Sequence, residues 1–275
     1  MPLAACAPQA LLVKGVADEL SGQGQADEED LVLARDASAF YLKLSESVLK
    51  KTPGHGPLAV AVVSGFAQYA YAFVAFDADR IETRDAKAAQ RLRSRAAQLY
   101  WRAQRHAMAA LESQQPGFAQ ALAADQVQLQ PQQVALAYWA AASWGAAISL
   151  SKDRPDAVAD LPLAMRLAQR AWALEPTHGA GALSALMGMF EAARPGGTPA
   201  SAQRFFDLAR QQGQGRNAGV LVSQAEALAA QGGDRSTFER LLREALAAAD
   251  ARKDMANEVM RERALWLLET ADDRF

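Results

Sequence analysis

Apolar residues recur along the chain at three- and four-residue steps, in segments long enough to be helices. Over residues 85–114, Leu92, Ala96, Leu99 and Ala103 follow one another on one side at helical spacing. Another segment begins at Pro57 and is apolar nearly all round until residues 77–80, where we expect it to end. Runs that alternate apolar and polar residues, which are typical of strands, do not compete with this pattern. The pattern predicts an all-α protein.

Two adjoining segments in the middle of the chain, residues 134–150 and 161–176, hold three of the five Trp residues. The first segment carries no charged residue, so most of its surface needs to be covered by other helices. The second segment ends at Pro176, which cannot continue a helix. We therefore expect the rest of the protein to pack around these two helices.

Small residues in the second segment, Ala164, Ala168 and Ala171, follow a step of four and then three, which lets a neighbouring helix approach closely. The same step occurs in three other segments, at Ala103, Ala107 and Ala110, at Ala202, Phe206 and Ala209, and at Phe238, Leu242 and Ala245. The first positions 164, 202 and 238 are 38 and 36 residues apart, near the tetratricopeptide period of about 34 residues. The sequence predicts stacked antiparallel helix hairpins, a tetratricopeptide-like α-α superhelix with a concave face.

The N-terminal part divides into a tether and the start of this domain. Residues 7–26 contain a short apolar piece followed by Ser-Gly-Gln-Gly-Gln, and we expect residues 1–26 to be a flexible tether. A helix follows from Asp27, and it stops at Thr52-Pro53-Gly54. Its apolar face is formed by Leu33, Phe40, Leu44 and Val48. Residues 27–275 are predicted to form a single helical-repeat domain.

The charge balance excludes some classes of partner. A formal net charge of -2 and a pI near 6.0 give no basic excess, so a nucleic-acid partner is not expected. The pattern does not indicate a transmembrane span. Residues 134–150 come closest, but their length and their Trp, Ser and Gly content fit a buried core helix better.

The single cysteine, Cys6, follows Leu3-Ala4-Ala5, which has the form of a lipobox. In such a motif the small residues give a signal peptidase access, and the cysteine then carries lipid. The signal peptide that precedes a lipobox is missing from this chain. The alternative reading is an Ala-rich tail. We favour lipidation of Cys6.

Several segments resemble one known family. They are FYLKLSESVLKKTPGH, FAQYAYAFVAFDADR, QLYWRAQRHAMAALESQQPGF, YWAAASWGAAISLSKDRPDAVADLP, and the end from Asp272 to Phe275. Together they resemble the T-component (TatT) of TRAP transporter systems, from about Asp30 to the C-terminus. The resemblance implies a tetratricopeptide-like periplasmic lipoprotein, anchored by lipid to a membrane (the outer membrane in our interpretation), that accompanies the periplasmic solute-binding protein of the transporter. It also implies a small hydrophobic or carboxylate ligand and is compatible with a homo-oligomer such as a trimer.

Aromatic residues give the main candidates for ligand binding, because Tyr and Trp can orient an apolar ligand in a cleft between helices. The alternative is that they are core residues, as aromatic stripes at helical spacing usually are. The candidates are Phe66, Tyr69, Phe73, Tyr100, Tyr138, Trp139 and Trp144.

Two charged residues in apolar surroundings, Glu46 and Arg102, are candidates for a buried ion pair or a partner contact, since burying either alone would be costly. Arg102 also continues a basic stripe formed by Lys87, Arg91 and Arg95, which we interpret mainly as a solvated face.

Catalytic chemistry has little support in the sequence. His55, His106 and His178 lie far apart, without a second metal ligand at helical spacing, so no metal site and no cofactor are expected. The first hypothesis is a non-enzymatic accessory lipoprotein of a TRAP-type transport system. The alternative is a soluble tetratricopeptide-type scaffold that binds a peptide segment of a partner protein.

Overall fold

The computed structural model describes residues 7–22 and 28–275, with side chains from Val13 onward. Helices and connecting turns make up these residues, and no strand occurs among them. The all-α prediction is confirmed. The described chain packs as two compact units, one containing residues 7–22 and 35–164 and the other containing residues 28–34 and 165–275.

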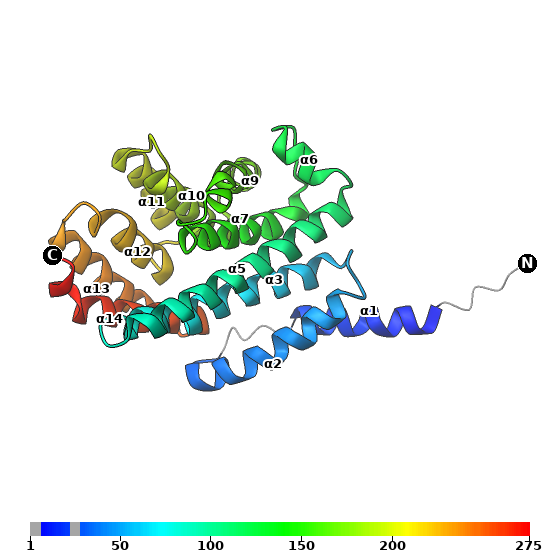
Figure 1. Cartoon of the computed structure of the whole chain (residues 1–275), viewed down its shortest axis with the longest axis horizontal. Helices are drawn as coiled ribbons and strands as arrows, with labels where there is room; N and C mark the ends of the chain where they lie inside the picture. The colour runs from blue at the N-terminus through cyan, green and yellow to red at the C-terminus, as the bar shows by residue number, and fades with distance from the viewer. Residues whose placement is uncertain (1–6, 23–27) are drawn as a thin grey trace, which may run out of the picture. The chain divides into compact units, whose positions relative to one another are not determined.

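Unit 1 is organised around three helices that pack in chain order, α3, α5 and α7 (Figure 1). The other helices of this part of the chain come before, between and after them in sequence, and α2 has its first four residues in unit 2. The elements are α1 (Ala7–Gly22), α2 (Leu31–Leu49), α3 (Gly56–Ala70), the π-helical η1 (Tyr71–Ala75), α4 (Phe76–Ile81), α5 (Ala86–Gln114), α6 (Phe118–Ala123), the 3-10 turn η2 (Pro131–Gln133), α7 (Val134–Ser149) and α8 (Pro155–Ala159). Helix α9 (Leu161–Leu174) contains the boundary between the units.

Unit 2 is a succession of helices in which neighbours in the chain pack on each other, α10 on α11, α12 on α13 and α13 on α14. Its elements are the 3-10 turn η3 (His178–Gly181), α10 (Ala182–Ala193), α11 (Pro199–Gln212), α12 (Ala218–Gln224), the π-helical η4 (Ala225–Ala229), α13 (Arg235–Ala251), α14 (Met255–Glu269) and the 3-10 turn η5 (Ala271–Asp273). This pairing of consecutive helices is the hairpin arrangement that the sequence predicts.

The small-residue steps identified in the sequence lie inside these helix contacts. Each of the twelve residues in the four steps is buried, and none is more than 3% exposed. Between α10 and α11 the approach is closer still, because a Cβ added at Gly188 would lie 2.9 Å from Cε2 of Phe206, which is itself fully buried. Small side chains therefore set the distance between helices in both units.

Short polar residues fix where several helices begin, because each accepts a hydrogen bond from a backbone N–H in the first turn. Asp30 accepts from the N–H groups of Val32 and Leu33 at the start of α2. The same role falls to Asp85 before α5, Thr198 before α11, Asn217 before α12, Asp234 before α13 and Asp254 before α14.

Two N-terminal segments differ from the sequence prediction. Residues 7–22, which were expected to tether, form α1, and Ala17 and Leu20 on this helix are buried. The helix from Gly56 continues past residues 77–80 and ends at Ile81. By length and composition this helix could cross a membrane, the one such case among the described residues, and 56% of its apolar window is buried in the protein. It packs on α5 and α7, as a core helix does.

Replacing Gly188 by Ala tests the close approach of α10 and α11. We expect Gly188→Ala to lower the free energy of unfolding by about 1–3 kcal/mol, because the new methyl group meets the buried ring of Phe206. Gly15→Ala is the control, because a Cβ at this position meets nothing within 4 Å. This substitution removes the entropic cost of a helical glycine, so it should not lower the free energy of unfolding. Urea unfolding of both variants measures the difference. Equal midpoints for Gly188→Ala and the wild type would contradict the packing.

Candidate functional site

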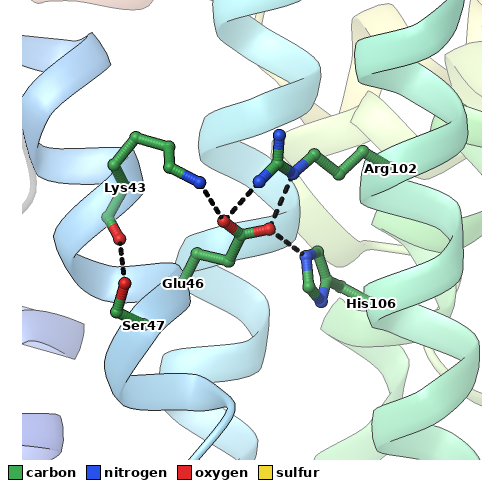
Figure 2. A network of polar contacts seen from close by, with 5 residues as sticks. All are labelled: Lys43, Glu46, Ser47, Arg102 and His106. Atoms are coloured by element: carbon green, nitrogen blue, oxygen red, sulfur yellow. Dashed lines mark hydrogen bonds and ion pairs between the residues drawn. The ribbon is translucent and has the colours of Figure 1, made fainter.

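A buried carboxylate joins α2 to α5 in unit 1. The side chain of Glu46, on α2, is 2% exposed and accepts hydrogen bonds from three basic groups. Arg102 donates through Nε and Nη2 at 2.6 and 2.5 Å, His106 Nε2 donates at 2.8 Å, and Lys43 Nζ donates at 2.7 Å. Figure 2 shows these groups converging on the two carboxylate oxygens. The structure thus brings Glu46 and Arg102 together.

The surroundings of Glu46 shift its pKa strongly. Burial alone would raise this pKa, but the hydrogen bonds from Arg102, Lys43 and His106 outweigh burial and hold the pKa of Glu46 far below its ordinary value of 4.5. The Phe66 ring lies against two of these groups, because Arg102 Cζ lies 4.9 Å from its centroid and the His106 ring stacks on it at 6.1 Å. With its pKa lowered in this way, Glu46 is ionised at neutral pH and links α2 to α5.

Two further polar contacts hold α2 to unit 1. Arg35 donates to the carbonyl oxygen of Phe73 at 3.1 Å, inside the π-helical segment η1, and also pairs with Asp77. The hydroxyl of Tyr41 donates to the carbonyl oxygen of Leu20 on α1. Helix α2 is therefore attached near its start, its middle and its end by side chains that form hydrogen bonds.

The apolar face predicted for α2 points to solvent. Leu33, Phe40 and Leu44, which lie on one side of the helix, are 56%, 75% and 42% exposed, and Val48, the fourth residue of the predicted face, is partly buried. We call Leu33, Phe40 and Leu44 the outer face of α2. The opposite side buries Ser38, Ser45 and Glu46 together with the apolar Ala34, Leu42 and Leu49. This helix thus presents a phenylalanine to water and turns a carboxylate inward.

The seven aromatic candidates lie on α3, η1, α5 and α7. Phe66, Phe73, Tyr100 and Trp144 are buried, and the other three are partly buried. Tyr100 belongs to a core cluster against which Tyr69 and Trp139 pack, and Tyr69 meets Phe73 edge to face at 5.5 Å. Tyr138 meets Trp139 in the same way at 5.0 Å, and burial raises the pKa of Tyr138 to about 12.

None of the seven aromatics lines either of two clefts found in the described residues. One is bordered by α5 and by residues 154–160, and the other lies in unit 2 beside α11 and η4.

The residues of the predicted basic stripe have different surroundings. Lys87, Arg91 and Arg95 are exposed, whereas Arg102 donates hydrogen bonds to Glu46. Cys6 lies outside the described residues.

The histidines make separate contacts. His55 Nε2 lies 2.9 Å from a carboxylate oxygen of Asp18, and His178 Nδ1 lies 3.4 Å from one of Glu175. The described residues contain no group of three His, Cys, Asp or Glu side chains that could hold a metal ion. The roles of His106 and Lys43 are not among those predicted from the sequence. Their spacing from the two candidates, four residues after Arg102 and three before Glu46, was the available signal.

Taken together, these features define an all-helical protein of packed hairpins whose helix α2 carries an exposed apolar face. A family model described as TRAP transporter T-component matches residues 27–275, and the chain belongs to that family. A protein of Treponema pallidum (strain Nichols), which carries the name "uncharacterized protein", is 28% identical over 267 residues, covering 90% of this chain and 81% of the relative. Membership implies an accessory role in TRAP transport and a periplasmic or membrane-associated location.

Glu46→Gln tests the joint between α2 and α5. We expect the free energy of unfolding at pH 7 to fall by about 3 kcal/mol, because the basic groups that converge on this buried position lose their counter-charge. The folded-state pKa of Glu46 is depressed, so the carboxylate stabilises the fold above pH 4.5 and this contribution is lost as the pH falls further. The difference between variant and wild type should therefore shrink below pH 4.5 in denaturant titrations.

Glu244→Gln provides the control, because Glu244 bonds Arg210 and Arg240 with side chains that are about a third or more exposed. Its cost should stay under about 1 kcal/mol. If Glu46→Gln costs no more than this control at pH 7, the cluster does not hold α2 in place.

Proposed function

We propose that this protein is a non-enzymatic accessory component of a TRAP-type transport system and that the outer face of α2 docks the periplasmic solute-binding protein. The family membership supports the accessory role, and the exposed Phe40 is the observation that carries the docking surface. Lipid attached to Cys6 anchors the protein to the outer membrane in this proposal, which the Leu3-Ala4-Ala5-Cys6 sequence supports.

The outer face has the character of a protein contact surface. Large aromatic residues at the centre of an interface with charged residues at its rim are typical of docking sites. Here Phe40 lies near the middle of α2, and the exposed Asp36 and Lys43 flank it at one-turn spacings. Because α2 is held by hydrogen bonds and ion pairs, its outer side chains remain available to a partner.

A double variant, Phe40→Ser with Leu44→Ser, tests this surface. Covering a side chain of this size contributes about 1.5–3 kcal/mol, so the dissociation constant for the purified solute-binding protein of the same transport system should rise at least about ten-fold. Isothermal titration calorimetry gives the constant. Thermal unfolding should change little, because both side chains are already exposed.

Leu174→Ser is the matched control, since Leu174 on α9 is 43% exposed and Leu44 is 42% exposed. It should bind like the wild type. Sedimentation of the same proteins tests whether a second copy of this chain covers the outer face instead. If the double variant loses self-association and keeps its affinity for the solute-binding protein, the outer face contacts a second copy and the docking proposal is wrong.

A further inference from the structure

A cleft of about 420 Å³ lies in unit 1 between α5 and the segment that starts α8. Helix α5 contributes Gln98, Trp101 and Arg105, whose spacing of three and four residues places them on one helix face. The second side of the cleft is formed by Arg154, Asp156, Ala157 and Asp160. The volume lies within the range of about 300–1,000 Å³ in which small-molecule sites fall.

Four charged side chains border this cleft, two guanidinium groups and two carboxylates. Among the described residues, Arg105, Arg154, Asp156 and Asp160 form no ion pair and no side-chain hydrogen bond, with each other or with any neighbour. Arg93 on the same helix α5 is paired with Asp79 and Glu82, whereas Arg91 and Arg95 are exposed without such a pair, as Arg105 and Arg154 are. A concave site that keeps both signs of charge unpaired can take both an anionic and a cationic group.

Trp101 supplies the apolar part of the cleft. Its ring packs against the core cluster around Tyr100, which fixes its position. Its indole Nε1 is buried without a hydrogen-bond acceptor among the described residues. Because this nitrogen is shielded from solvent, Trp101 offers a ligand its ring and not its N–H group.

We infer that this cleft binds a small zwitterionic solute of the amino-acid class. Arginine side chains bind carboxylates in a bidentate manner, so Arg105 and Arg154 take the carboxylate. The carboxylates of Asp156 and Asp160 take the ammonium group, and the Trp101 ring packs on the apolar part of the solute. A purely anionic ligand leaves the two aspartates unpaired, and a purely cationic one leaves the two arginines unpaired.

The test is calorimetric titration of the purified full chain with the twenty free amino acids and with a matched set derived from leucine. The set comprises L-leucine, 4-methylpentanoate, which lacks the ammonium group, and 3-methylbutylamine, which lacks the carboxylate. We expect at least one amino acid to bind, and each singly charged analogue to bind at least ten-fold more weakly than its zwitterion. Absence of binding by all twenty, or equal binding of a singly charged analogue, overturns the inference.

Variants locate the site. Arg105→Gln and Asp160→Asn should each weaken binding about ten-fold or more, and Trp101→Phe should weaken it less, because the ring is kept and only the N–H is lost. Arg95→Gln is the matched control, since Arg95 is exposed on α5 and does not line the cleft. Thermal unfolding of each variant shows that its fold is intact. Affinity unchanged in Arg105→Gln and Asp160→Asn overturns the assignment.

A zwitterion can also be a lipid headgroup, so a second arm uses vesicles of phosphatidylethanolamine. Binding to these vesicles that Arg105→Gln abolishes, without binding of any free amino acid, overturns the assignment to a solute. The cleft does not depend on the docking proposal. Variants of the cleft should leave the affinity for the solute-binding protein unchanged, so either proposal can fail without the other.

Discussion

Close contact between helices at small side chains is the constraint on which both units depend. Residues at steps of four and three, most of them alanine, lie in the contacts of α5, α9, α11 and α13, and all twelve are buried. A larger side chain at any such position would separate two helices along their whole length, since interiors are packed without room to spare. The large aromatic residues then fill the remaining space, as Phe206 does against Gly188. The spacing of small residues along the chain therefore determines how closely neighbouring helices pack.

Helix α2 is the exception to this rule, and its exception follows from charge. Its attachments include the close approach of Leu42 to Gly65, the buried Ala34 and Leu49, and three polar groups, the carboxylate of Glu46, the guanidinium of Arg35 and the hydroxyl of Tyr41. Burial of Glu46 is tolerated because four hydrogen bonds satisfy its oxygens. These directed bonds fix the orientation of the helix, so the apolar residues of its outer face are not needed for packing.

The sequence predicts the elements better than their orientation. The helix over residues 85–114 is found as α5 at Ala86–Gln114, and the buried steps are where the spacing places them. Periodicity assigns Leu33, Phe40 and Leu44 to one face, but it cannot tell that this face is the exposed one. That depends on Glu46 meeting Arg102 and His106, which are 56 and 60 residues away in the chain. The π-helical segment η1 is missed because Arg35, which binds its carbonyl, lies 38 residues before it.

The orientation of α2 bears on function because it leaves large apolar side chains exposed. The inward side buries Ala34, Leu42 and Leu49 together with Glu46. A buried ion pair contributes little net free energy compared with well-packed apolar residues of similar volume, so Glu46 and its basic partners define the orientation of the helix more than they add stability. On the opposite side Phe40 is 75% exposed and Leu44 is 42% exposed. Covering each of these side chains contributes about 1.5–3 kcal/mol, so a partner seated on this face would gain a hydrophobic contribution that folding alone does not provide.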